Sequence, residues 1–233
     1  MNSLKNIFML AKYNFKILFG GKYFLFMVLS FVYFCYLLFH AAYSGTALDE
    51  EVVAANMIMP SLLLVFYSAT YGIQKDEETK ILEIFFCIPN YMYKVWLLRL
   101  LFIFTACYVN VVIFSYMAHL LLCPVEVFAM ANNTIFVVVL FGSLAFWLST
   151  VIKSGNGVAV VLLVLWGLLI YVGKQFYVNT IWDISLNPYS EPSNIHSEIW
   201  QTTITNRKML LAAVSCVLIL MSLGNLRRRE QLL

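Results

Sequence analysis

The chain has 233 residues, of which 62% are hydrophobic and only 12% are charged, whereas a soluble domain carries roughly 25% charged residues. So little polar surface cannot face water on all sides, which excludes an ordinary soluble domain and makes lipid the solvent for much of the protein. The net charge of +3 says little about partners, and the 5 cysteines include no C-x-x-C pair, so they indicate neither a disulfide framework nor a zinc site.

Residues 1–22 predict a helix that lies along the membrane surface. Apolar side chains share one face of a helical wheel, and Lys5, Lys12 and Lys16 lie on the other. A helix with these two faces sits in the interface, with its lysines near anionic headgroups. The same pattern also fits an orientation anchor that takes no part in any further activity, and both roles stay open.

Six stretches farther along the chain are long and apolar enough to cross a bilayer. About 20 helical residues span the hydrocarbon core, where the backbone satisfies its hydrogen bonds only in helices or closed barrels. These stretches do not alternate polar with apolar residues as barrel strands do. We therefore expect six helical spans, at 23–42, 53–73, 96–122, 134–152, 156–173 and 209–226.

The positive charges predict which side of the membrane the chain ends face. Cytoplasmic loops carry an excess of Lys and Arg. Of the 15 Lys and Arg residues, all but Lys174, Arg207 and Lys208 fall on one side of the predicted spans. We therefore expect both termini, including the tail 227–233, in the cytoplasm.

The inner connection between the second and third spans predicts a short amphipathic helix at about 76–89. Acidic residues at 76–78 suit a helix N-terminus, where backbone N–H groups are exposed, and Pro89 ends the run. Ile81, Leu82 and Phe85 recur at helical spacing and give more apolar surface than a cytoplasmic loop needs. Such a face fits a groove on a partner protein. A helix lying on lipid is the alternative, which the acidic residues disfavour beside an anionic leaflet.

The outer connection, 174–208, contains two tryptophans, a tyrosine at position 189 and two prolines. Trp and Tyr favour the level of the lipid headgroups. We expect this segment to lie on the outer leaflet or to dip into it before the last span begins at 209.

Polar side chains inside the spans are candidates for a substrate path. No Asp, Glu, Lys or Arg lies deep in any predicted span, which argues against a proton-coupled carrier or an ion pump. Tyr67 and Asn110 are the candidate path residues; the alternative is that such groups only hydrogen-bond neighbouring helices. A wall of Phe, Tyr, Met and Leu suits an amphipathic or hydrophobic cargo.

Several short motifs together resemble one family of membrane proteins, the ABC type-2 (ABC-2) permeases. The run ETKILEI at 78–84, the Ile88-Pro89 pair and Arg99 resemble the coupling-helix region of that family. LNPY at 186–189, the Asn206-Arg207 pair and RRRE at 227–230 are similar to it as well. So is the layout of an interfacial N-terminal helix, six spans and a long outer connection between the last two.

The resemblance implies a single transmembrane domain over residues 1–233 with the all-α ABC type-2 exporter fold, in a bacterial plasma membrane. The chain would be the permease subunit of an ATP-driven exporter, pairing in the bilayer with a second permease subunit, the same or related. Each would rest on a separate ATPase subunit that binds ATP and Mg²⁺. Glu78, Ile81, Leu82 and Phe85 would dock in a groove of that ATPase, and 174–208 would form short re-entrant helices.

The chain itself carries no motif for a nucleotide or metal site. It lacks a G-x-x-x-x-G-K-[ST] loop that would cradle phosphates, so we expect no ATP hydrolysis, cofactor, metal, catalytic residue or nucleic-acid partner of its own. Two other functions stay open: a non-transporting subunit that anchors or senses for an ATPase complex, and an intramembrane enzyme. His40, His119 and His196 form no H-E-x-x-H motif, which disfavours the enzyme.

Overall fold

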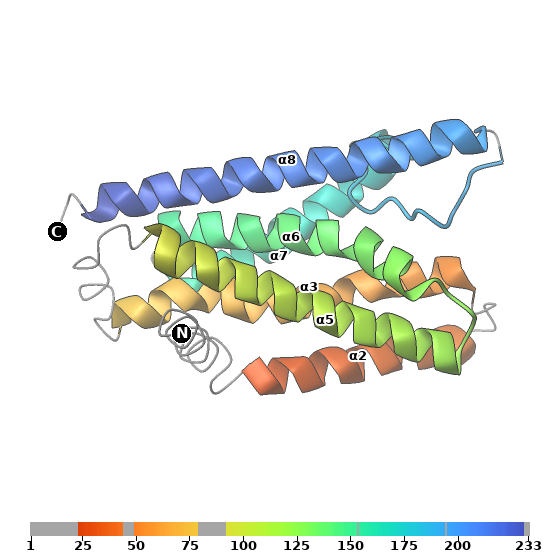
Figure 1. Ribbon diagram of the computed structural model, residues 1–233, viewed down its shortest axis with the longest axis horizontal. Helices are drawn as coiled ribbons and strands as arrows, with labels where there is room; N and C mark the ends of the chain where they lie inside the picture. The colour runs from red at the N-terminus through yellow and green to blue at the C-terminus, as the bar shows by residue number, and fades with distance from the viewer. Residues whose placement is uncertain (1–22, 44–48, 79–91, 153, 194, 231–233) are drawn as a thin grey trace, which may run out of the picture.

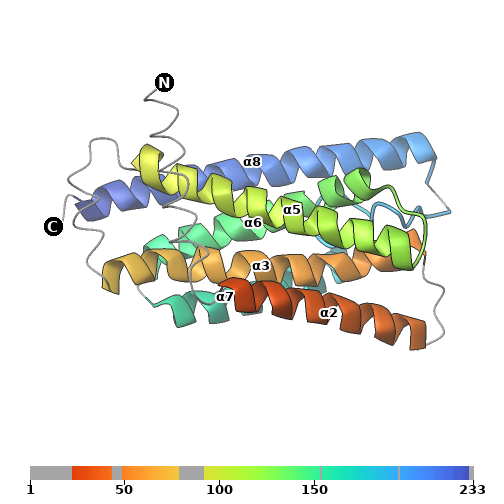
Figure 2. The ribbon, with the colours of Figure 1, turned by 60° about the horizontal axis from the view of Figure 1, so that its bottom comes forward.

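The computed structural model describes residues 23–43, 49–78, 92–152, 154–193 and 195–230. In chain order they form α2 (Tyr23–Tyr43), α3 (Glu50–Glu78), the π-helical turn η1 (Met92–Leu97), α5 (Leu98–Leu121), α6 (Val127–Val151), α7 (Gly155–Phe176) and α8 (Ser197–Glu230). The helices run along the long axis of the molecule (Figures 1 and 2). The described residues include no strand, which confirms the expected all-α class.

Four helices within the described residues are long and apolar enough to cross a membrane: Val95–Leu121, Val127–Val151, Gly155–Gly173 and Ser197–Arg227. A shorter apolar stretch, Phe24–His40, lies in α2. Large apolar side chains also stand on the surface of these helices, including Leu120, Leu163 and Leu220, which are all more than 60% exposed. Lipid solvates such positions and water does not, so the molecule is a membrane-embedded helical protein.

Helix α6 forms the centre of the bundle. It packs against α3, α5, α7 and α8. Of its 18-residue apolar stretch 67% is buried, against at most 33% of the corresponding stretch in each of the other three candidate spans. Small residues on α6, such as Gly142, Ser143 and Ala145, are buried. Small side chains let helix backbones approach closely in a membrane, where packing rather than hydrophobic burial holds helices together.

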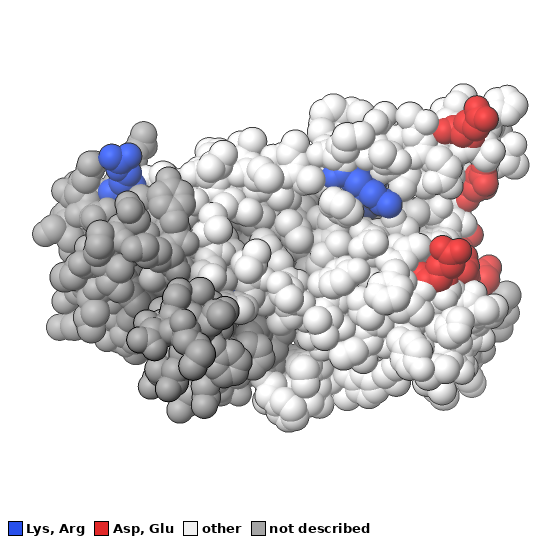
Figure 3. Space-filling model, viewed as in Figure 1, with Lys and Arg blue, Asp and Glu red and all other residues white. Residues whose placement is uncertain are grey.

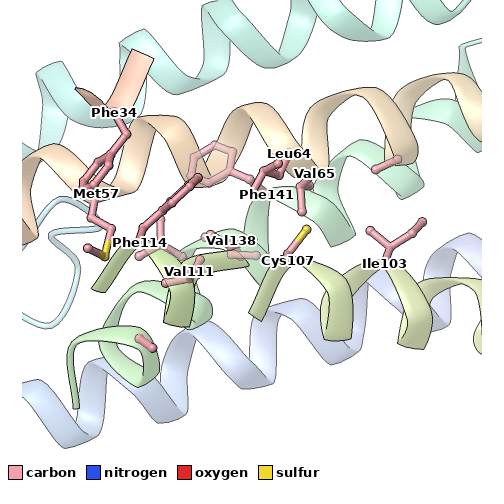
Figure 4. Close-up of a cluster of buried hydrophobic side chains, with 14 of the residues drawn as sticks. Phe34, Met57, Leu64, Val65, Ile103, Cys107, Val111, Phe114, Val138 and Phe141 are labelled. Carbon is pink, nitrogen blue, oxygen red and sulfur yellow. The ribbon is translucent and has the colours of Figure 1, made fainter. Parts of the chain in front are cut away.

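The main core joins α2, α3, α5 and α6 (Figure 4). Phe34 of α2 stacks on Phe114 of α5 with ring centroids 5.1 Å apart. Phe141 of α6 meets Trp166 of α7 edge to face at 4.8 Å. Aliphatic and sulfur-containing side chains fill the space between the rings, among them Met57, Leu64, Val65, Cys107, Val111 and Val138.

A buried hydrogen bond fastens α2 to α3. The Ser30 hydroxyl donates to the Pro60 carbonyl at 2.5 Å, and both residues are buried. Pro60 lies inside α3, where its ring removes one backbone N–H from the helix ladder. A serine on a neighbouring helix is a usual partner for backbone groups near such a proline in a membrane.

Three helix boundaries differ by five residues or more from those that the sequence predicted. α3 continues to Glu78, so the acidic residues 76–78 end this helix and do not begin a new one. α6 begins at Val127 instead of 134, and α8 begins at Ser197 instead of 209. Hydropathy marks only the part of a helix that suits lipid, whereas polar residues continue the helix into water until a breaker or cap stops it.

The outer connection differs from the short re-entrant helices that the family resemblance implies for 174–208. α7 extends to Phe176 and α8 begins at Ser197. The described residues between them, 177–193 and 195–196, form turns and no helix. Two prolines in this stretch disfavour helix because each removes a backbone donor. We call the described part of 177–196 the outer segment.

The two ends of the bundle differ in charge. At one end of the molecule, α3 and α8 stop and η1 and α7 begin. At the opposite end, α3, α6 and α8 begin (Figure 1). Carboxylates gather at that opposite end, which we call the acidic end (Figure 3). Its acidic residues are Asp49, Glu50, Glu51, Glu126, Glu191 and Glu198.

Candidate functional site

The residues predicted to dock on an ATPase lie at the margin of the described structure. Glu78 is the last residue of α3, and Ile81, Leu82 and Phe85 fall within 79–91, outside the described residues. α3 ends and η1 begins at the same end of the bundle (Figure 1), so the connection leaves and re-enters there. The docking role stays a prediction from the sequence.

A second packed cluster closes the bundle at this same end. Trp96 packs with Phe146 of α6, ring centroids 6.0 Å apart, and with Leu223 and Leu226 of α8. The buried guanidinium of Arg99 lies over the Trp96 ring at 5.0 Å from its centroid, within the range of a cation–π interaction. The start of the third predicted span is therefore anchored to α6 and α8.

The structure satisfies Asn110 within its own helix. Its Nδ2 donates to the Ala106 carbonyl at 2.8 Å. Other polar groups of the spans do the same with the carbonyl four residues earlier, among them Asn56, Thr70, Ser115 and Thr134. The sequence left open a substrate path or bonds to neighbouring helices. These groups bond to the nearer carbonyl on the same helix, and Ser115 also contacts Met57 Sδ of α3 at 3.4 Å. Tyr67 lies in α3 directly after Phe66.

An apolar pocket, open on one side, lies between α3, α6 and α7; its empty space, open solvent included, is about 500 Å³. The described residues that line it include no charged side chain; they are Met59, Leu62, Leu63, Val65, Phe66, Phe141, Ala145, Leu162, Leu163 and Trp166. Asn110 is not among its lining residues. We call it the apolar pocket.

A second pocket lies at the acidic end beneath the outer segment; its empty space, open solvent included, is about 340 Å³. One wall is apolar and comes from α3 and α6, with Ala54, Ala55, Ile58, Met130 and Val137. The other side carries polar groups of α6, α8 and the outer segment, at Asn133, Thr134, Ser185, Asn187, Tyr189 and Arg207. We call it the outer pocket.

Hydrogen bonds hold the outer segment over this pocket. Asn187 Nδ2 donates to the Glu51 carbonyl of α3 at 2.8 Å, and Asn187 Oδ1 accepts from the backbone N–H of Tyr189 at 3.1 Å. The indole N–H of Trp200 donates to the Pro188 carbonyl at 3.2 Å. Trp200 also packs with Leu186 in a small buried cluster. The roof of the outer pocket is thus fastened to both α3 and α8.

Arg207 of α8 is buried under this roof, with only 2% of its surface exposed. One terminal nitrogen donates to the Ile184 carbonyl at 2.6 Å, while its buried Nε has no hydrogen-bond partner among the described residues. Asp183 is a neighbouring carboxylate, but its Oδ1 accepts from the N–H and the hydroxyl of Ser185, at 2.9 and 2.8 Å. No carboxylate of the described residues forms an ion pair with Arg207, within 4.0 Å.

Asn133 and Tyr189 form the other polar side of the outer pocket. Asn133 Nδ2 donates to the Tyr189 hydroxyl at 3.4 Å, and the buried Asn133 Oδ1 has no partner among the described residues. Burial raises the pKa of the Tyr189 phenol, the bond from Asn133 opposes that rise, and the charges of Glu50 and Glu126 add to it. The phenol therefore keeps its proton at neutral pH.

Sequence reasoning counted Arg207 as a charge on the outer side and as part of a family-like Asn206-Arg207 pair, and missed its burial. The signal was present in the spacing, because Trp200, Ile204, Arg207 and Leu211 follow one helical face. All four are buried in α8. A charged residue in the middle of an otherwise apolar face indicates a buried charge.

Comparison with protein-family models, with curated proteins and with solved structures found no match. The class of protein therefore rests on the fold and on two pockets lined by described residues. It is a helical membrane protein with an uncharged pocket along the bundle and a polar one at the acidic end.

Proposed function

We propose that the chain is the permease subunit of an ATP-driven exporter in a bacterial plasma membrane, and that it moves an amphipathic or hydrophobic cargo. The observation that carries the transport role is the apolar pocket between α3, α6 and α7. The similarity of residues 78–89 and 186–189 to ABC type-2 permeases supports the use of ATP.

The proposal gives the chain six spans, four of which are the long apolar helices. α2 has 21 residues and α3 has 29, so they are about 32 and 44 Å long at 1.5 Å per residue. The hydrocarbon core is about 30 Å thick, and either helix is long enough to cross it. The buried bond from Ser30 to Pro60 would satisfy a polar group of this pair within the bilayer.

The charge distribution supports an orientation with the acidic end outside. Arg99 and Arg227 belong to the opposite end, where η1 leads into α5 and α8 ends. Positive residues next to spans favour the cytoplasm. In this orientation both termini are cytoplasmic, and residues 76–89 lie on the side where ATP is available.

The apolar pocket suits a cargo with a large apolar surface. Aliphatic and aromatic side chains line it, and its one polar group is the Trp166 indole N–H, which has no partner among the described residues. α7 forms one wall of the pocket. It is the least buried of the four candidate spans, because only 17% of its 18-residue apolar stretch is buried. Few packing contacts make a helix easier to displace. A shift of α7 away from α3 and α6 would widen the pocket.

Pull-down of the tagged chain from its native membranes tests the partner. An ATPase should co-purify, and the Leu82→Ala/Phe85→Ala double variant should lose it. Truncating a buried interface anchor often costs about 2 kcal/mol or more, which is over tenfold in affinity. Asn110→Ala is the control, because Asn110 bonds only within α5. Wild-type recovery of the ATPase by an inserted double variant would contradict the docking site.

The same complex in vesicles tests the cargo pocket. With ATP it should accumulate a fluorescent amphipathic peptide, and Leu163→Trp, which fills the apolar pocket, should lower the rate. Val160→Trp is the matched control, because Val160 is similarly exposed on α7, at 60% against 62% for Leu163, and does not line the pocket. An ATPase that co-purifies without any ATP-dependent accumulation would favour a non-transporting anchor or sensor instead.

A further inference from the structure

Arg207 is buried beside the carboxylate of Asp183 but forms no ion pair within 4.0 Å with any described residue. Its side chain is buried, and a single hydrogen bond, to the Ile184 carbonyl, occupies one of its nitrogens. A guanidinium has five N–H donors, and a buried charge is costly unless it is paired and hydrogen-bonded. The Nε of Arg207 has no partner among the described residues. The group that would complete this site is an anion.

Two further groups of the outer pocket can donate to such an anion. The Tyr189 hydroxyl accepts from Asn133, and no bond in the described structure uses its own proton. The amide of Asn133 leaves its Oδ1 without a partner. As the side chains stand, Nδ2 donates to the phenol oxygen and leaves the Tyr189 proton for the anion. After a half-turn of the amide, Oδ1 would accept that proton and Nδ2 would be left for the anion instead. In either orientation Arg207 and one of these two side chains present donors.

The depth of Arg207 in the bilayer indicates what carries the anion. Arg207 precedes Arg227 by 20 residues on α8, which is about 30 Å of helix and matches the thickness of the hydrocarbon core. With Arg227 at one membrane surface, Arg207 lies at the level of the opposite headgroups. The facing wall of the pocket is apolar, with Ala54, Ile58 and Val137.

We propose that the outer pocket binds the anionic headgroup, a phosphate or a carboxylate, of an amphiphile whose tail lies along the apolar wall. Arg207 is the charged partner of the headgroup, and Tyr189 or, after the half-turn of its amide, Asn133 supplies a further hydrogen bond. The site goes beyond the proposed function, because it binds an amphiphile whether or not the chain transports one. Asp183 opposes the anion, but its Oδ1 is engaged with Ser185, and salt screens the exposed acidic residues outside the pocket.

Titration calorimetry on the full chain in a nonionic detergent tests the site, with dihexanoyl phosphatidic acid as the probe. The wild type should bind it, and Arg207→Gln should bind about tenfold more weakly or worse, because bonds to charged groups are the strong ones. Lys208→Gln is the matched control: Lys208 is the next residue on α8, it is only half-buried and it does not line the pocket. Arg207→Lys, which keeps the charge, should recover part of the affinity.

Asn133→Asp keeps the shape of the side chain and adds a negative charge to the pocket. It should also weaken binding of phosphatidic acid, and it serves as the decisive variant if Arg207→Gln does not fold. Wild-type affinity in Arg207→Gln or in Asn133→Asp would overturn the proposal. So would an equal loss in Lys208→Gln, or equal binding of dihexanoyl phosphatidylcholine, whose headgroup has no net charge.

Two further arms identify the source of the headgroup. Inorganic phosphate should bind far more weakly than phosphatidic acid, and equal binding would overturn the amphiphile part of the proposal. Mass spectrometry of the purified protein should then detect anionic lipid retained by the wild type and lost in Arg207→Gln if the ligand is a membrane lipid. Binding of the probe without any retained lipid would assign the site to an amphiphile that arrives from outside the bilayer.

Discussion

Gly142 lies where α6 passes closest to its neighbours. A Cβ atom at this position would lie 2.6 Å from Cε1 of Phe104 in α5 and 3.0 Å from Cγ1 of Val65 in α3. Gly167 of α7 is the opposite case, because a Cβ there would meet nothing within 4 Å. Close approach of membrane helices depends on small residues at the contact. The first glycine is required by packing and the second is not.

Gly142→Val should therefore destabilise the bundle, and Gly167→Val should not. Overpacking a well-packed core typically costs about 1–3 kcal/mol, and here two helices would have to move away from α6. The measurement is the thermal unfolding midpoint of the purified chain in detergent, followed by size-exclusion chromatography. Equal midpoints for the two valine variants would show that α6 does not pack against Phe104 and Val65 as described.

Burial of Arg207 illustrates what sequence can and cannot give at the scale of a residue. Its place on one face with Trp200 and Ile204 is readable from helical spacing. The residues that face it cannot be read from the sequence, because hydrogen-bonded partners at this site are distant in the chain. Ile184 is 23 positions from Arg207, and Glu51 is 136 positions from Asn187. The apolar and polar sides of the outer pocket are brought together only when the chain folds.

At the scale of the element, the outer segment is fixed chiefly by one side chain of α8. Trp200 is 1% exposed and packs with Leu186 and Ile204, while its indole N–H bonds to the Pro188 carbonyl. Trp182 lies in the same segment but is 57% exposed. The two tryptophans look alike in the sequence, and only burial separates an anchor from a surface residue.

Trp200→Ala should loosen the outer segment, and Trp182→Ala should leave it in place. Removing a buried tryptophan costs about 3–5 kcal/mol, and it also leaves the Pro188 carbonyl without its donor. Hydrogen exchange of backbone amides in 177–193 should rise several-fold in the first variant, with α6 unchanged. Similar exchange in both variants would mean that Trp200 is not the anchor.

The helices themselves were the most predictable elements, because an apolar run that enters lipid satisfies its backbone as a helix. The described structure has a helix at each of those runs. Their ends were poorly predicted, as α8 begins at Ser197 rather than at 209. The helix continues through Thr202, Thr203 and Thr205, whose hydroxyls bond to carbonyls four residues earlier, so polar residues that suggested a loop are accommodated in a helix.

At the scale of the whole molecule, carboxylates gather at the acidic end, and the described surface beyond it on the face in Figure 3 is largely uncharged, with few Lys or Arg groups. The carboxylates of the acidic end surround the outer segment and the turn between α5 and α6, which contains Cys123 and Glu126. A bilayer selects the orientation of such a molecule through its Lys and Arg residues rather than through its acids. Cys123 therefore gives a chemical test of which end faces out.

Cys123 should react with a membrane-impermeant maleimide in intact cells when it is the only cysteine of the chain.

The pH dependence of this labelling follows from the surroundings of the thiol. Burial, and then the charges of Glu50 and Asp49, raise the pKa of the Cys123 thiol. The thiolate is the reactive form, so a raised pKa lowers its fraction at neutral pH. Labelling should thus be slower than that of a free thiol at pH 7 and should rise by about tenfold per pH unit up to pH 8.5. A cysteine placed in the tail by Leu233→Cys should react only after permeabilisation. Labelling of the tail in intact cells, with Cys123 protected, would reverse the orientation. A labelling rate of Cys123 at pH 7 equal to that of a free thiol would contradict its burial beside Glu50 and Asp49.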